Sequence, residues 1–247
     1  MEGYFDRAAE TYDHKQVTDA ERDDVICTLA RKLCGVPSEE EGRSEPFRVL
    51  DVGAGTGALS LRLLGVGAGT APCARVTVCA VDLSREMLAV LRSKAAAAGV
   101  GVERLCTVHA DLCAASGTEA SAAVQTASGA AAFDAACSSF AMHHMDDVGA
   151  CARTVFGLLR PGARAAFFDL LHEPHTPLFH PAAAHAFVTR HGLAPAELEA
   201  WFRAAGFVDV HAWRCAEFAK HCADAPQDDP VRVFGIVVVT GTKPGTV

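Results

Sequence analysis

From residue 47 onward, short apolar runs alternate with longer amphipathic segments. The apolar runs have the length and composition of buried strands, and the amphipathic segments have helical periodicity. Strands that alternate with helices favour a doubly wound, mostly parallel sheet with helices on both faces. The strands predicted in this part of the chain are residues 49–52, 75–81, 105–109, 133–138 and 164–170.

Two further β-rich runs follow, at residues 207–218 and 231–240. They are close enough in the chain to pair as antiparallel neighbours. We therefore predict the α/β class, with a seven-stranded, mostly parallel sheet and an antiparallel C-terminal hairpin. The helices predicted between the strands cover residues 59–64, 84–98, 146–159 and 195–205.

Residues 1–46 differ from the rest of the chain by their acidity. They carry 12 acidic and 6 basic side chains, out of 30 and 22 in the whole chain. Thr18 is a predicted N-cap for a helix in this arm, and residues 37–46 read as a polar linker. We predict two parts, a helical lid over residues 1–46 and a second domain over residues 47–247.

Composition and charge exclude several classes of protein. The 247 residues are 50% hydrophobic, as in packed globular proteins, and their net charge of −8 argues against nucleic acid or anionic lipid as a partner. We find no run of about 18 uncharged apolar residues and no secretory signal at the start, so we expect a cytoplasmic protein with no membrane span. The ten cysteines form no C-x-x-C pair and are expected to be reduced.

A glycine-rich turn joins the first strand to the first helix, in the run Val49-Leu-Asp-Val-Gly-Ala-Gly-Thr-Gly-Ala-Leu59. Its three glycines allow a tight turn and the close approach of a ligand to the backbone. In a doubly wound sheet this turn lies at the carboxyl edge, where ligands bind. A second run with the same spacing, residues 65–69, follows a helix and is predicted to be a loop. Exposed insertions of low complexity are predicted for residues 65–74 and 114–132.

Acidic residues follow the next two strands. Asp82 ends the second strand, where its carboxylate can accept both hydroxyls of a ribose. Asp111 and Leu112 follow the third strand, where they can frame an adenine ring, and residues 133–144 supply a fourth strand that borders the reacting atoms. With these motifs, residues 47–170 resemble the class I S-adenosylmethionine-dependent methyltransferases of the small-molecule type, similar to ubiquinone and menaquinone methyltransferases.

The resemblance implies a Rossmann-like fold, S-adenosylmethionine as cofactor and a role for each matching residue. The glycine turn would contact the methionine part, whose ammonium Asp51 would orient, while Asp82 would bind the ribose and Asp111 the adenine amino group. The run Phe5–Asp13 resembles the family's N-terminal F-D-x-x-A-x-x-Y-D segment, which folds over the cofactor. The implied cofactor-binding residues are Tyr12, Asp51, Gly53, Ala54, Gly55, Gly57, Asp82, Leu83, Met87, Asp111, Leu112, Ser138 and Phe140.

The implied reaction is the in-line transfer of a methyl group to a small-molecule acceptor. Positioning alone can supply ~7–11 kcal/mol of the required barrier reduction. A general base is needed only if the acceptor must lose a proton early, and the candidates are His143 and His144 after the fourth strand. We expect the acceptor pocket to be built by the lid, residues 139–145 and residues 171–194, and the acidic lid to disfavour anionic acceptors.

Five histidines in the second half of the chain raise the question of a metal site. Their spacings match no compact zinc motif, and the nearby acid is Glu173. We therefore expect no metal there and interpret the stretch as a cap over the acceptor site. The five are His172, His175, His180, His185 and His191.

Three alternatives stay open at this point. The glycine turn would also suit a nicotinamide enzyme, but Asp82 lies 29 residues after Gly53, against ~20 in that motif. A methyltransferase-like scaffold could bind the cofactor, or have lost it, and serve as a partner without turnover. An RNA or protein methyltransferase lacks support, because we find no basic stripe interleaved with aromatic residues.

Overall fold

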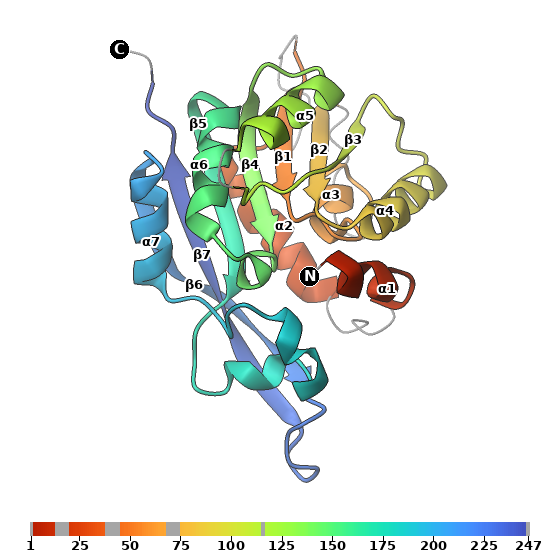
Figure 1. Cartoon of the computed structure of the whole chain (residues 1–247), viewed down its shortest axis with the longest axis vertical. Coiled ribbons are helices and arrows are strands. Elements are labelled where there is room, and N and C mark those ends of the chain that lie inside the picture. The colour runs from red at the N-terminus through yellow and green to blue at the C-terminus, as the bar shows by residue number, and fades with distance from the viewer. Residues whose placement is uncertain (1, 13–19, 38–44, 68–74, 115–116, 246–247) are drawn as a thin grey trace.

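A seven-stranded sheet forms the centre of the molecule (Figure 1). The structure is a computed structural model that describes residues 2–12, 20–37, 45–67, 75–114 and 117–245. Within these residues the strand order is β3-β2-β1-β4-β5-β7-β6, and β7 runs antiparallel to both of its neighbours while the other strands are parallel. The predicted α/β sheet with an antiparallel C-terminal hairpin is confirmed. The strands are β1 Phe47–Val52, β2 Val76–Asp82, β3 Leu105–His109, β4 Phe133–Ser139, β5 Leu159–Leu170, β6 Val208–His221 and β7 Val231–Thr242.

Helices cover both faces of the sheet, as a doubly wound fold requires. One core lies between the sheet and α2, α3 and α4, and the other lies between the sheet and α5, α6 and α7. The α-helices are α1 Glu2–Tyr12, α2 Ala20–Cys34, α3 Ala58–Leu63, α4 Arg85–Ala97, α5 Thr118–Ser128, α6 Val148–Leu158 and α7 Pro195–Ala204. The described residues also form the short 3-10 helices η2 Met142–His144, η3 Thr176–Phe179 and η4 Ala182–Phe187.

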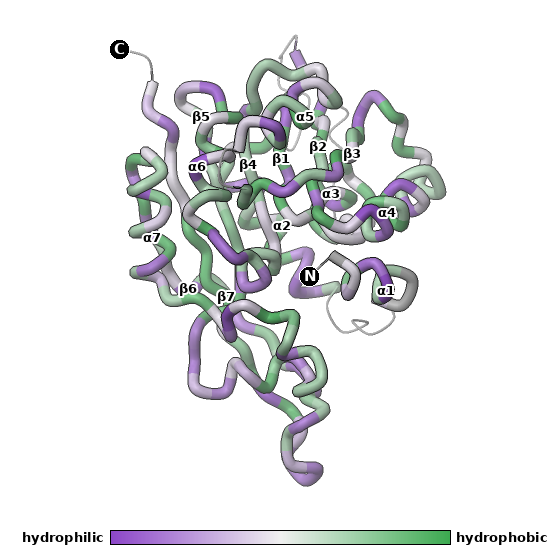
Figure 2. The backbone as a smooth tube through the Cα atoms, in the orientation of Figure 1, coloured by the Kyte–Doolittle hydropathy of each residue, from purple (hydrophilic) through white to green (hydrophobic). Residues whose placement is uncertain are grey.

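The central strands are apolar because both of their faces are buried. On β1, Leu50 and Val52 pack into the core beneath α5–α7, while Val49 packs into the core beneath α2–α4. Figure 2 shows hydrophobic residues along the central strands. This arrangement explains why these strands read as continuous apolar runs in the sequence rather than as an alternating pattern.

The prediction of an exposed insertion at residues 114–132 is wrong for most of its length. Residues 118–128 form α5, whose Ala120 and Val124 are buried against the sheet. Gly117 and Gly129 flank the helix with left-handed backbone angles, φ +57° and +62°. Alanine has the highest helix propensity, so a segment rich in small residues can form a helix when one of its faces is buried.

The fifth strand begins earlier than predicted. It starts at Leu159, which pairs with Phe133 of β4, and the register then shifts before Arg164 pairs with Ala135. The strand therefore passes through Pro161 and Gly162, which were expected to separate a helix from the strand. Proline lacks an N–H, and it is tolerated here because this first part of the strand is irregular and exposed.

The N-terminal arm consists of two helices with different surroundings. Ile26, Cys27 and Ala30 bury one side of α2 against the sheet, so α2 is part of the helical layer. Helix α1 lies beside α4 instead (Figure 1). The predicted cap Thr18 and residues 38–44 of the predicted linker lie outside the described residues.

Two further sequence expectations concern the chain as a whole. Among the described residues, no helix combines the length and the apolarity needed to cross a membrane. The nine cysteines in the described part of the chain are all free.

Candidate active site

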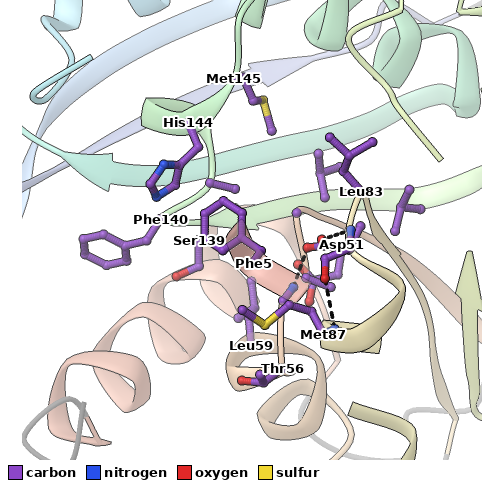
Figure 3. A pocket seen from close by; sticks show the side chains of 18 of the residues that line it. Phe5, Asp51, Thr56, Leu59, Leu83, Met87, Ser139, Phe140, His144 and Met145 are labelled. Atoms are coloured by element: carbon purple, nitrogen blue, oxygen red, sulfur yellow. Dashed lines mark hydrogen bonds between the residues drawn. The ribbon is translucent and has the colours of Figure 1, made fainter. Parts of the chain in front are cut away.

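A cavity of about 220 Å³ lies at the carboxyl ends of β1, β2, β3 and β4 (Figure 3). Strand β1 has β2 on one side and β4 on the other, so the chain reverses its direction of winding here. Doubly wound sheets bind their ligands at such a switch point. The residues predicted from the sequence that line the cavity are Tyr12, Asp51, Gly53, Ala54, Gly55, Asp82, Leu83, Met87, Asp111, Leu112, Phe140 and His144.

Three predicted site residues lie outside the cavity lining. Gly57 begins α3 with φ +88°, and an added Cβ would lie 2.1 Å from Leu91 Cδ1, so its small size serves the packing of α3 on α4. Ser138 is buried and donates a hydrogen bond from Oγ to the Val52 carbonyl oxygen at 2.7 Å. His143 is 1% exposed and is turned toward Asp169.

Gly53 lies in the glycine-rich turn after β1 and lines the cavity. Its φ is +67°, in the region that favours glycine, and its N–H donates to the Val81 carbonyl at 2.9 Å. A Cβ at this position would lie 2.3 Å from the Cβ of Ala141, which follows β4. The loops after β1 and β4 can therefore approach this closely only with glycine at position 53.

Asp82 is fixed at the cavity wall by backbone donors. Its Oδ2 accepts from the Gly55 N–H at 2.7 Å, and its Oδ1 accepts from the Ser84 N–H at 2.8 Å. Burial raises the pKa of this carboxyl, and the two N–H donors oppose that shift. Each carboxylate oxygen has a second lone pair, so Asp82 can still accept hydrogen bonds from a ligand.

Within the described part of the chain, only one of the two carboxylate oxygens of the buried Asp51 has a hydrogen-bond partner. Its Oδ2 accepts from the Ser60 hydroxyl at 2.5 Å, while its Oδ1 is buried and has no hydrogen-bond partner in the described part of the chain. Burial raises the pKa of Asp51 to about 7. A buried, unpaired carboxylate oxygen in the wall of a cavity indicates that a bound ligand supplies the donor.

The far end of the cavity combines apolar walls with one exposed acid. Met87 and Leu112 are buried, and Leu83 is 36% exposed. Asp111 is exposed, and its Oδ1 accepts from the Cys113 N–H at 2.8 Å. Apolar side chains beside an acceptor oxygen suit a flat ring that carries an amino group.

Helix α1 is held beside the cavity by contacts of Tyr4, Phe5 and Asp6, of which Phe5 and Asp6 belong to the run that resembles the family's N-terminal segment. Ser84 donates from its hydroxyl to Asp6 Oδ1 at 2.6 Å, at the start of α4. The Tyr4 ring stacks on Phe187 with centroids 4.1 Å apart. Phe5 lines the cavity and packs edge-on against His144 at 4.9 Å, and Figure 3 shows it among the lining side chains.

Phe140 has a strained backbone conformation at the end of β4. Its φ is +53°, which is uncommon for a residue other than glycine, and such strain is often found at functional sites.

Arg22 of α2 contacts the Phe140 ring. Its guanidinium lies 4.5 Å from the centre of that ring and pairs with Asp23 at 2.8 Å. Arg22 and Asp23 also line the cavity. The sequence contains one indication that Arg22 faces the interior. Arg22 stands four residues before Ile26 and so shares the buried side of α2.

The structure brings His180 next to His143 and His144, a pair that lies far from it in the sequence. The His180 ring lies 5.1 Å from the His143 ring and 5.4 Å from the His144 ring, between ring centres. Burial is the main cause that lowers the pKa of His144 to about 3 and that of His180 to about 2. Of the predicted acceptor cap, residues 171–194, none lines the cavity, although Phe187 contacts α1 and His180 contacts the histidine pair.

Comparisons with known proteins agree with this geometry. The model of a family described as a methyltransferase domain matches residues 20–212. No curated protein sequence matches the chain.

Solved structures share the fold at low sequence identity. The YcgJ protein from Bacillus subtilis has a TM-score of 0.59 and 17% identity, over 90% of this chain and 99% of that one. The [4+2]-cyclase SpnF has a TM-score of 0.58 and 16% identity, over 90% and 81%. Phosphoethanolamine N-methyltransferase 2 from Haemonchus contortus, solved with S-adenosyl-L-methionine, has a TM-score of 0.55 and 14% identity, over 91% and 52%.

Proposed function

The chain belongs to the methyltransferase-domain family and uses S-adenosylmethionine, and we propose that it methylates a small molecule held at the cavity described above. The observation that carries the proposal is the unpaired Asp51 Oδ1, buried beside the glycine turn and on the same cavity wall as Asp82. S-adenosylmethionine is an amino acid joined to a nucleoside. Its ammonium group can donate to Asp51, and its ribose hydroxyls can donate to Asp82.

The cofactor's parts would be held by residues at the carboxyl ends of three strands, β1, β2 and β3. Asp51 would accept from the ammonium, and Asp82 would accept from the two ribose hydroxyls. Asp111 would accept from the adenine amino group, with the ring against Leu83 and Met87. The turn at Gly53 would let the backbone approach the methionine part, because no Cβ intervenes there.

The bound cofactor supplies a methyl group already activated by a sulfonium, so little covalent chemistry is required of the protein. Phe5, Tyr12 and Phe140 would exclude water from this part of the cavity and hold the acceptor in line with the methyl group. Positioning of this kind is worth ~7–11 kcal/mol.

We propose that positioning, rather than a histidine base, dominates catalysis. His143 does not line the cavity. His144 does, but its pKa of about 3 makes it a weak base at neutral pH, and an efficient general base has a pKa near the working pH.

The acceptor would bind between α1 and the loop after β4, which includes His144 and Met145. The exposed acid Asp146 lines this side and disfavours an anionic acceptor, whereas the charge of Asp23 is balanced by Arg22. The free cysteines fit a reducing compartment, and we propose a cytoplasmic location.

Methyl transfer is tested with the purified chain, S-adenosylmethionine labelled in its methyl group, and a panel of neutral, cationic and anionic small molecules. We expect label in at least one neutral or cationic acceptor, and loss of the transfer in Asp82→Ala. Cofactor binding without transfer to any acceptor would contradict the proposal and favour a scaffold without turnover.

A further inference from the structure

A cluster of three histidines lies beside the cavity without a role in the mechanism above. His143 and His144 belong to η2, which follows β4, and His180 follows η3. Each of the three offers one ring nitrogen, and these nitrogens lie within 4.8 Å of one another. Three imidazoles from two segments of the chain that converge in this way can coordinate a single ion.

Two of the rings are already oriented by their other nitrogen. His143 Nδ1 lies 2.6 Å from Asp169 Oδ1, and His144 Nδ1 lies 2.8 Å from the Phe187 carbonyl oxygen. Both partners are acceptors, so each Nδ1 carries a proton, and in the neutral ring each Nε2 presents a lone pair. A carboxylate or carbonyl behind the imidazole in this manner is the usual support of a metal-ligating histidine.

Asp169 is itself held rigidly. It is fully buried, and its carboxylate also accepts from the backbone N–H groups of His143 at 3.0 Å and Leu170 at 2.7 Å. The carboxylate therefore fixes both the backbone and the ring of His143.

The lone pair of His143 is buried and unpaired. Its Nε2 has no hydrogen-bond partner among the described residues, and the side chain is 2% exposed. The neighbouring rings are those of His144 and His180, with centroids 4.0 Å and 5.1 Å away. A buried acceptor without a donor costs free energy, and a bound ion would remove that cost.

We propose that His143, His144 and His180 bind one divalent transition-metal ion of the zinc class. Imidazole suits Zn²⁺, Ni²⁺, Cu²⁺ and Fe²⁺, and three imidazoles leave a fourth position open. Around a tetrahedral ion with bonds of ~2.0–2.1 Å, ligand nitrogens lie ~3.4 Å apart, so the rings must close by about an ångström. The site would form by movement of the His144 and His180 rings, which are only partly buried.

The position of the site suggests which acceptors it would favour, and this step rests on the proposed function. His144 lines the cavity, so the open position of the ion would face the acceptor. A hydroxyl or thiol bound there would lose its proton to solvent more readily, because a metal ion stabilises the resulting anion. The ion would then supply the activation that neither histidine provides as a base, and the acceptor atom would be oxygen or sulfur.

The test is titration of the chelator-treated protein with Co²⁺, followed by visible absorption, in the absence of cofactor. We expect saturation at one equivalent of Co²⁺ and at least ~10-fold weaker binding in His180→Ala, whose partly buried side chain can be removed with little effect on folding. His221→Ala is the matched control, because His221 is exposed and outside the cluster. Circular dichroism of each variant verifies the fold.

No saturable binding, or equal binding by the wild type and His180→Ala, would overturn the metal site. The cysteines also bind Co²⁺, and binding that survives in His180→Ala would be assigned to them. The titration contains no cofactor, so absence of Co²⁺ binding would not contradict the proposed methyl transfer. Likewise, absence of methyl transfer would not contradict the metal site.

Discussion

At the scale of single residues, Asp51 connects the stability of the fold with the binding of its ligand. Burial raises its pKa from 3.8 to about 7. Because the pKa in the folded state is the higher one, the native state holds more protons than the unfolded state between about pH 4 and pH 7. Stability is therefore greatest below this window and falls as the pH rises through it, whereas an ammonium ligand needs the charged form that prevails above it.

Asp51→Asn should separate these two effects. Asparagine has no charge to bury, so we expect a higher melting temperature than the wild type at pH 8 and a flatter dependence of stability on pH between 5 and 8. Binding of S-adenosylhomocysteine should weaken by ~10-fold, because a hydrogen bond to a charged group is worth about 1.5–3 kcal/mol. Thermal unfolding across pH and calorimetry at pH 8 measure both, with the exposed Asp228→Asn as control. An unchanged pH profile together with unchanged affinity would refute the role of Asp51.

Gly53 offers a second test at this scale. An alanine there must adopt φ +67° and place its Cβ 2.3 Å from that of Ala141, so we expect Gly53→Ala to lose at least about 2 kcal/mol in the free energy of unfolding. Gly157→Ala is the control, because that glycine lies in α6 with open space around it, and alanine there should be neutral or stabilising by up to about 1 kcal/mol. Urea unfolding compares the two, and equal stabilities would contradict the close approach of the β1 and β4 loops.

At the scale of elements, α1 lies beside α4, and among its described side chains only Ala9 is buried. Its links to the rest of the fold include the hydrogen bond from Ser84 to Asp6 and the aromatic contacts of Tyr4 and Phe5. Segments with few buried contacts open at low free-energy cost, which suits a lid over a ligand.

Asp6→Ala should loosen α1 without unfolding the domain. Loss of the charge-assisted hydrogen bond should speed amide hydrogen exchange over residues 2–12 by about 10-fold, while α2 and the sheet keep their protection. Arg7→Ala, exposed on the same helix, is the control and should exchange like the wild type. Exchange in Asp6→Ala no faster than in Arg7→Ala would show that the contact with Ser84 does not hold the helix.

The element scale also shows which parts of the fold the sequence could predict. The strands and α4 carry strong local signals: the Ser84 side chain caps the start of α4, and Gly99 follows its end with φ +71°. The sequence signal for α5 is weak, because its composition is typical of a flexible segment. The buried side chains of this helix are Ala120 and Val124. Its helical state follows from packing against the sheet, which composition does not reveal.

At the scale of the whole molecule, the order of elements predicts where the cavity lies but not everything that surrounds it. Alternation of strands and helices puts Asp51, Asp82 and Asp111 at one edge of the sheet, and the structure confirms that all three line one cavity. The meeting of His180 with His143 and His144 could not be predicted. It depends on a loop whose base is closed by two backbone hydrogen bonds, from the His172 N–H to Leu193 and from the Leu193 N–H to Leu170, and no spacing of residues encodes that path.

The central claim is that this cavity binds S-adenosylmethionine through the acids at the sheet edge. Isothermal titration of S-adenosylhomocysteine into the wild type, Asp82→Ala and the exposed control Asp228→Ala tests it most directly, with circular dichroism to verify that each variant is folded. We expect one equivalent bound by the wild type and by Asp228→Ala, and binding at least ~10-fold weaker in Asp82→Ala because the ribose hydroxyls lose their acceptor. No binding by the wild type, or equal binding by Asp82→Ala, would contradict the claim.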